Sequence, residues 1–194
     1  MTCGSVIKLV HDVSRYRLHS HEINFSNGRQ SVTAHGSRDD PNSYWLVKEG
    51  EGNAVCELGD KITCGSTIRL EHTTTRRNLH AERDASMLSD NMEVSAFGVA
   101  GEGDSKDSFI LECEQASQCD AESHCENDAF WKRYDLVRLR HSTLSQYVGT
   151  SSRARYNDRN CPGCPILGQQ EVALVPKTDD TLWFAAEGVY PSVH

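Results

Sequence analysis

The chain has 194 residues, of which 37% are hydrophobic and 25% charged, with a formal net charge of -8 at pH 7. A chain of this length buries roughly 70% of its unfolded surface, so we expect a true hydrophobic core. The negative charge repels nucleic-acid phosphates and anionic lipid, and no apolar run approaches the roughly 20 residues of a spanning helix. We therefore expect no nucleic-acid partner and no direct membrane insertion.

Eight cysteines are present. This even and high number points to an oxidising compartment, where disulfides persist. Asn24 begins an N-glycosylation sequon, Asn24-Phe25-Ser26, although such triplets also arise by chance. No signal peptide precedes Cys3, because the chain opens on a predicted strand, and we expect that a leader has been removed.

Three stretches repeat one pattern along the chain. Residues 3–11 read Cys-Gly-Ser-Val-Ile-Lys-Leu-Val-His, residues 64–72 read Cys-Gly-Ser-Thr-Ile-Arg-Leu-Glu-His, and residues 135–141 read Asp-Leu-Val-Arg-Leu-Arg-His. Each pattern ends on a histidine, and seven residues later comes an aliphatic residue. These two positions are occupied by His11, His72 and His141, and by Leu18, Leu79 and Val148.

Two further blocks recur in each unit. Alternating residues stand at 30–34, 92–96 and 170–174, and a turn then leads into 42–45, 107–110 and 180–183. Alternation bounded by Asn, Asp, Ser and Gly predicts short, half-buried strands. Twelve strands in three units could close around a pseudo-threefold axis, which removes exposed sheet edges. The predicted fold is all-β, a β-trefoil.

We expect one domain over residues 1–194, with repeats at about 3–48, 64–112 and 131–187. Residues 112–128 are predicted to form an acidic loop that contains cysteines, and residues 151–167 an inserted loop in the third unit. The inward-facing positions predict a core of Ile7, Leu9, Leu18, Val32, Trp45, Ile68, Leu70, Leu79, Val94, Ile110, Val137, Leu139, Val148, Val172 and Trp183.

Four motifs of these units resemble MIR-domain proteins, and above all the stromal cell-derived factor 2-like family. They are Leu-His-Ser-His at 18–21, Asn-Ser-Tyr-Trp at 42–45, Asn-Leu-His at 78–80, and Val-Ser-Ala-Phe-Gly at 94–98 with Gly-Glu-Gly-Asp at 101–104. The resemblance covers nearly the whole chain and is most specific from 64 to 103. It implies a β-trefoil of three MIR-type repeats.

The resemblance also implies a function. It indicates a non-enzymatic protein of the endoplasmic reticulum lumen, acting with a J-domain co-chaperone and a BiP-type chaperone in quality control of unfolded or mannosylated clients. Two features depart from the family pattern. The third unit has Tyr147-Val148-Gly149 in place of Leu-His, and the insertion with Cys161 and Cys164, like the pair Cys119 and Cys125, is unlike the family. The chain also ends without a Lys-Asp-Glu-Leu-type signal, so we expect that it is trimmed or that partners retain it.

The histidines fall into two groups. A residue repeated by threefold symmetry usually serves the hydrogen bonding of each repeat, so His11, His72 and His141 are predicted to be structural. The second group lies beside loops, where trefoil modules commonly hold ligands. It gives the candidate binding residues Arg17, His19, His21, Asn78 and His80. We find no Ser-His-Asp, paired-carboxylate or phosphate-loop pattern, and therefore expect no catalysis, no cofactor and no metal.

The cysteines suggest a repeated framework. Cys3 and Cys64 begin equivalent units, and Cys56 and Cys113 follow them, which predicts the bonds Cys3–Cys56 and Cys64–Cys113. Local bonds Cys119–Cys125 and Cys161–Cys164 would then close the two inserted loops. The alternatives are free thiols, a zinc site of these last four, or a thiol-disulfide exchanger at Cys161 and Cys164, which the absence of a helical pattern disfavours.

Two binding functions remain. One is protein binding through the loops, and the other is lectin-like recognition of O-mannosylated or otherwise glycosylated clients. Lectins usually present aromatic platforms, yet aromatic residues are only 7% of the chain. Trp45 and Trp183 are expected in the core, which leaves Trp131 and Tyr147. Protein binding is therefore favoured.

Overall fold

The computed structural model describes residues 1–114 and 130–191, and the described chain forms twelve strands. Each unit supplies four strands and has a short 3-10 helix before its last strand. The first unit contains β1 (Val6–His11), β2 (Arg17–Asn24), β3 (Gln30–His35), η1 (Pro41–Ser43) and β4 (Trp45–Glu49). The second unit contains β5 (Thr67–His72), β6 (Arg77–Ala85), β7 (Met92–Phe97), η2 (Ser105–Asp107) and β8 (Phe109–Cys113). The third unit contains β9 (Val137–His141), β10 (Tyr147–Arg155), β11 (Gln170–Val175), η4 (Asp179–Thr181) and β12 (Trp183–Val189).

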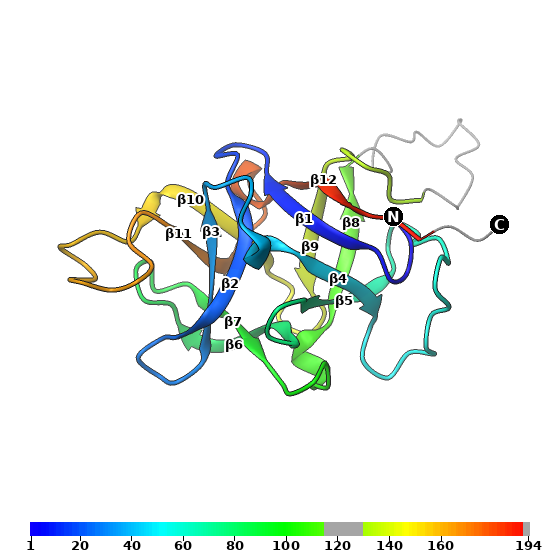
Figure 1. Ribbon diagram of the computed structural model, residues 1–194, viewed down its shortest axis with the longest axis horizontal. Coiled ribbons are helices and arrows are strands. Elements are labelled where there is room, and N and C mark those ends of the chain that lie inside the picture. Colours follow the sequence, from blue (N-terminus) through cyan, green and yellow to red (C-terminus); the bar gives the residue numbers. More distant parts are fainter. Residues whose placement is uncertain (115–129, 192–194) are drawn as a thin grey trace.

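Six strands close into a ring of antiparallel pairs, in the order β1, β4, β5, β8, β9, β12 and back to β1. The other six form the hairpins β2–β3, β6–β7 and β10–β11, whose second strands pair with one another. Figure 1 shows the ring strands near the N-terminus and the hairpins to the left and below. The all-β prediction is confirmed, and this pairing is compatible with a trefoil.

Alternate strand residues fill the interior. Trp45, Phe109 and Trp183 begin the last strand of their units, and all three side chains are fully buried. Burying a large apolar side chain contributes roughly 1.5–3 kcal/mol. Ile110, predicted for the core, is partly exposed instead. The residue of the second unit that corresponds to Trp45 and Trp183 is Phe109, one position before Ile110. A one-residue shift along a strand moves a side chain to the opposite face.

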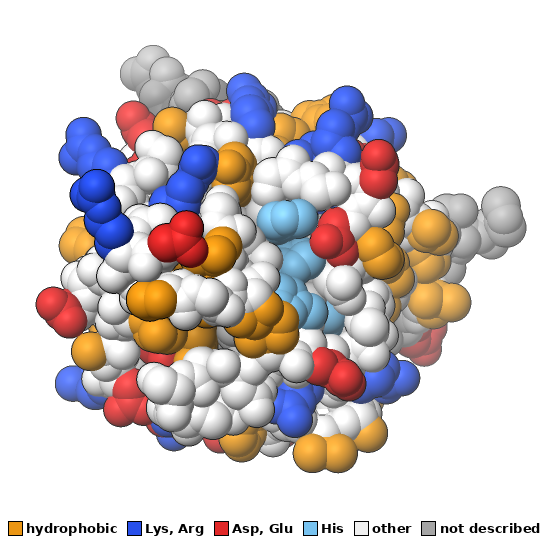
Figure 2. Space-filling view, turned by 60° about the vertical axis from the view of Figure 1, so that its left-hand side comes forward, with side chains coloured by type: hydrophobic (Ala, Val, Ile, Leu, Met, Phe, Trp, Pro, Cys, Tyr) orange, Lys and Arg blue, Asp and Glu red, His pale blue; other side chains and the backbone are white. Residues whose placement is uncertain are grey.

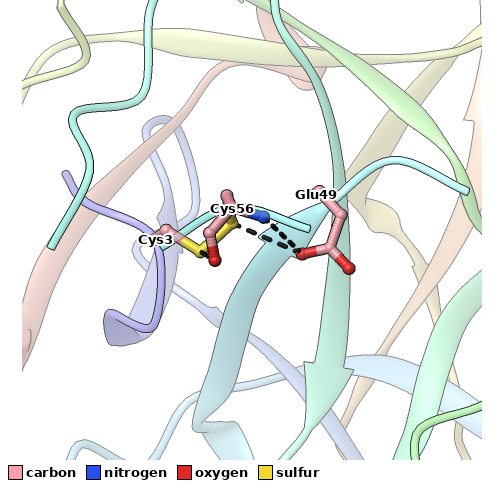
Figure 3. A group of neighbouring side chains, drawn as sticks. All are labelled: Cys3, Glu49 and Cys56. Carbon is pink, nitrogen blue, oxygen red and sulfur yellow. Dashed lines mark hydrogen bonds between the residues drawn. A yellow bond between two sulfur atoms is a disulfide. The ribbon is translucent and has the colours of Figure 1, made fainter. Parts of the chain in front are cut away.

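The structure joins Cys3 to Cys56 and Cys64 to Cys113, with Cα atoms 6.0 Å and 5.6 Å apart. These are the pairs that the repeat predicts. Figure 3 shows the first bond beside Glu49, whose Oε2 lies 3.5 Å from the backbone N of Cys56.

A third disulfide joins Cys161 to Cys164 in the inserted loop. The predicted Cys119–Cys125 bond lies outside the described residues. None of the helices in residues 1–114 and 130–191 has the length and apolar character needed to cross a bilayer.

Candidate functional site

The barrel histidines, His11, His72 and His141, have matching surroundings. Each is fully buried at the end of the first strand of its unit, and its Nε2 donates to a backbone carbonyl 2.9–3.0 Å away. Each ring also packs on an aromatic core side chain, with centroids 5.1–5.2 Å apart. The carbonyls belong to Asp180, Asn42 and Lys106, and the aromatic partners are Trp183, Trp45 and Phe109. The structural role predicted for these histidines is confirmed.

Burial lowers the pKa of all three barrel histidines, and that of His72 falls to about 4. The cause is loss of hydration, which disfavours the charged form. The rings are therefore neutral at pH 7, as donation from Nε2 and acceptance at Nδ1 require.

The first hairpin gathers three imidazoles beside one carboxylate. His19 is 2% exposed, and its Nδ1 lies 3.1 Å from the Ser43 hydroxyl while its Nε2 lies 2.9 Å from His21 Nδ1. His35, at the end of β3, has its ring centroid 4.9 Å from that of His19. Asp40 caps η1 and places Oδ2 3.5 Å from His35 Nδ1. We call His19, His21, His35 and Asp40 the histidine cluster.

The histidine cluster reaches the surface. Among the described histidines only His21 and His35 are partly exposed, the others being buried. Figure 2 accordingly shows histidine side chains together at the centre of one face, with acidic side chains beside them.

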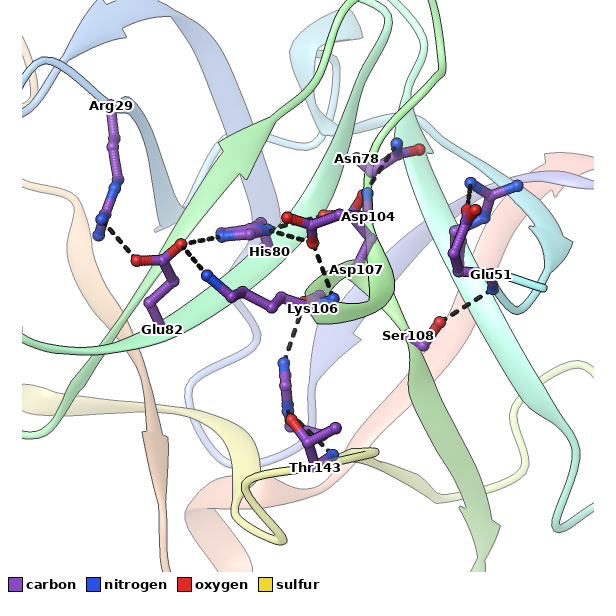
Figure 4. Close-up of polar contacts among 12 residues, drawn as sticks. Arg29, Glu51, Asn78, His80, Glu82, Asp104, Lys106, Asp107, Ser108 and Thr143 are labelled. Carbon is purple, nitrogen blue, oxygen red and sulfur yellow. Dashed lines mark hydrogen bonds and ion pairs between the residues drawn. The ribbon is translucent and has the colours of Figure 1, made fainter.

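The second hairpin replaces this arrangement with acids and cations. His80, fully buried, has Nδ1 2.8 Å from Asp107 Oδ1 and Nε2 3.2 Å from Glu82 Oε1. Lys106 Nζ lies 2.7 Å from Glu82, and Arg29 approaches the same carboxylate from β2–β3 (Figure 4). The hydrogen bond from Lys106 lowers the pKa of Glu82 to about 2. Two cations therefore lie at the carboxylate that faces His80 Nε2.

The third hairpin has no side chain at the same position, because the residue there is a glycine. Gly149 stands where the others have His19 and His80, and a Cβ there would lie 2.6 Å from Val175 Cγ2 and 2.9 Å from the Asp180 carbonyl oxygen. A groove of about 560 Å³ opens beside it. Its lining mixes apolar and polar groups and includes Met87, Leu88, Ser151, Arg153, Glu171 and Pro176.

The five predicted binding residues do not form one site. His19 and His21 meet in the first unit, whereas Asn78 and His80 meet Asp107 in the second. Arg17 is directed to Glu187 of β12, 3.8 Å away. Asn24, the glycosylation candidate, is exposed at the end of β2, and its use stays a prediction.

Sequence reasoning missed His35, Asp40 and the groove. His35 was detectable, because hairpin register pairs it with Arg17, two residues from His19. Asp40 had a weaker signal, as the residue before Pro41 in a turn. Trp131, which we left outside the core, is fully buried, so it offers no platform to a ligand.

The chain is similar to known proteins over nearly its whole length. The model of the MIR domain family matches residues 1–184. Human stromal cell-derived factor 2 is 39% identical over 193 residues, covering 98% of this chain and 82% of that protein. The crystal structure of the SDF2-like protein from Arabidopsis thaliana superposes with a TM-score of 0.85 at 38% identity, over 100% of this chain and 98% of that one.

Two other structures are informative. The S. cerevisiae protein O-mannosyltransferase Pmt1-Pmt2 complex, solved with its sugar donor, matches at 26% identity and a TM-score of 0.79, over 98% of this chain and 26% of that one. A structure described as the BEL beta-trefoil matches at 16% identity and a TM-score of 0.58, over 97% of this chain and 96% of that one, and shows likeness of fold alone.

Proposed function

Because the chain belongs to the stromal cell-derived factor 2 family of MIR-domain proteins, we propose that it is a non-enzymatic binding module of the endoplasmic reticulum lumen. We propose further that residues 1–194 form one β-trefoil of three repeats with pseudo-threefold symmetry. Its partners are a J-domain co-chaperone, a BiP-type chaperone and unfolded clients. The disulfides joining described cysteines support an oxidising compartment.

The groove at Gly149 is the observation that carries a binding function. Ligand sites are concave and combine apolar walls with a few polar groups that fix orientation. Here Met87, Leu88 and Pro176 supply apolar surface, while Arg153 and Glu171 supply charge and hydrogen bonding. A groove of this composition suits an extended polypeptide segment.

The test uses the groove residue Met87, which is 42% exposed. Calorimetry should show that a purified lumenal J-domain co-chaperone binds the wild type, and that Met87→Asp weakens binding at least tenfold, the factor expected for about 1.4 kcal/mol. Val13→Asp is the matched control, because Val13 is also exposed but does not line the groove. Full binding by Met87→Asp would place the partner elsewhere, and no binding by the wild type would contradict the proposed partner.

A lectin function is the second candidate, and the likeness to the O-mannosyltransferase complex favours it. Against it, none of the described residues lining the groove is aromatic, and stacking on aromatic rings usually anchors sugars. Binding of an O-mannosyl peptide, but not of the same unmodified peptide, would favour the lectin function over protein binding.

We propose no catalysis by Cys161 and Cys164. Their disulfide lies in turns between Tyr156 and Gly168, and no helix begins at Cys161 to activate a thiol. Purified protein should not reduce insulin disulfides or hydrolyse mannosides. Turnover that is lost in Cys161→Ser would contradict this proposal.

A further inference from the structure

The histidine cluster has the composition of a metal centre. His19, His35 and Asp40 each offer a ligand atom, and these atoms all lie within 4.8 Å of one another. His21 stands beside them, with Nδ1 2.9 Å from His19 Nε2. We propose that the histidine cluster binds a divalent transition-metal ion, with zinc as its expected occupant.

The repeat does not need these side chains. The hairpins of all three units pair in the same register, with Arg17 opposite His35, Asn78 opposite Phe97 and Tyr147 opposite Val175. The third unit nevertheless carries Gly149, Ser151, Val175 and Thr178 at the four positions of the cluster. The fold therefore forms without any imidazole or carboxylate there.

Two ring nitrogens of the cluster also lack hydrogen-bond partners. His21 Nε2 and His35 Nδ1 are buried atoms without one. Asp40 Oδ2, 3.5 Å from His35 Nδ1, is farther than an ordinary hydrogen bond. Leaving a buried polar atom unsatisfied costs about 1–3 kcal/mol. A metal ion would use the lone pair of such a nitrogen.

The ligand types and their support suit zinc. Zinc takes imidazole nitrogen and carboxylate oxygen, commonly from three or four protein ligands. The Asn42 backbone N–H donates to Asp40 Oδ1 at 2.9 Å, which holds the carboxylate with Oδ2 towards His35. The Ser43 hydroxyl orients the His19 ring from Nδ1, the kind of outer contact that ligating histidines usually have.

The related group in the second unit is less suitable. His80, Asp104 and Asp107 also lie within 4.8 Å of one another. However, both ring nitrogens of His80 already face carboxylates, and Lys106 places a cation 2.7 Å from Glu82. A nearby cation repels a metal ion. From the sequence we expected no metal, and that expectation did not consider His35 and Asp40, which join the cluster only through the fold.

The experiment measures Zn²⁺ binding to chelator-stripped protein by calorimetry. The wild type should bind one equivalent, and His35→Gln and Asp40→Asn should each weaken binding at least about a hundredfold, since even outer contacts contribute 10–100-fold. Asn retains an oxygen that can cap η1, so Asp40→Asn should fold. Asp39→Asn is the matched control, because it removes the same charge from an exposed neighbour.

Co²⁺ supplies a second readout. Its visible absorption should show a site of nitrogen and oxygen ligands, without the intense bands of thiolate ligation, and His35→Gln should abolish the spectrum. Melting curves of each variant confirm folding. The proposal is overturned if the wild type does not bind Zn²⁺ in the micromolar range, or if folded His35→Gln and Asp40→Asn bind as the wild type does.

Discussion

The barrel histidines and the histidine cluster show imidazole side chains in two different roles, one structural and one suited to binding. His11, His72 and His141 are buried once in each unit and make corresponding bonds. The histidine cluster is confined to the first unit, and two of its ring nitrogens have no hydrogen-bond partner. Features kept in every repeat stabilise the repeat, whereas features of one repeat are free to serve binding.

The same contrast holds for the cysteines, where we expect the largest effect. Cys64–Cys113 belongs to the repeated framework and spans 49 residues, whereas Cys161–Cys164 spans 3. Chain entropy predicts a loss of about 4 kcal/mol for Cys64→Ala/Cys113→Ala, and about 2 kcal/mol for the short loop. Urea unfolding measures both. Equal losses would show that repetition does not mark the stabilising bonds.

Replacing a barrel histidine should have the next largest effect. His72→Leu leaves the Asn42 carbonyl without its donor and removes the acceptor of the Thr75 hydroxyl, and both contacts are within 3.0 Å. We expect a loss of about 3 kcal/mol in unfolding free energy. His11→Leu and His141→Leu should lose similar amounts, and a loss confined to one unit would argue against a shared structural role.

These outcomes bear on what the sequence could predict. The repeats identified the strands and the structural histidines because local alternation and repetition are visible in sequence. We predicted Ile110 for the core, whereas Phe109 is the buried residue. This was missed because the length of the preceding turn sets the register of the strand, and that length is not visible in the sequence. His35 and Asp40 were missed because strand pairing and a turn bring them to His19, and the groove because it forms between hairpins of two units.

Acid should destabilise the protein through the barrel histidines. His72 has a pKa of about 4 when folded and of about 6.5 when unfolded, so the unfolded state takes up the proton first. Its contribution is present above pH 6.5 and is lost as pH falls towards 4. At pH 5 the loss is about 2 kcal/mol. Unfolding curves at pH 7 and pH 5 measure it, and the difference should shrink by that amount in His72→Leu.

Exchanging a residue between units tests the second hairpin. Asp107→Ser gives it the residue of the first unit and removes the acceptor of Asn78 Nδ2 and of the Asp104 backbone N–H. We expect a loss of about 1.5 kcal/mol, at the low end for bonds to a charged group, because the serine hydroxyl can still meet His80. Asp179→Ser, at an exposed acid of η4, is the control and should change stability little.

The smallest effect is expected within the histidine cluster itself. His21→Leu removes a partly exposed ring that has no partner at Nε2, and the native hydrogen bond that is lost is the one to His19 Nε2. Unfolding free energy at pH 7, measured in urea without metal, should fall by about 1 kcal/mol, the low end for leaving a buried polar atom unsatisfied. Glu22→Leu, at the exposed neighbour, gives the baseline for adding an apolar side chain to this strand. A loss near that of His72→Leu would mean that the histidine cluster stabilises the fold after all, and the contrast between repeated and unrepeated histidines would fail.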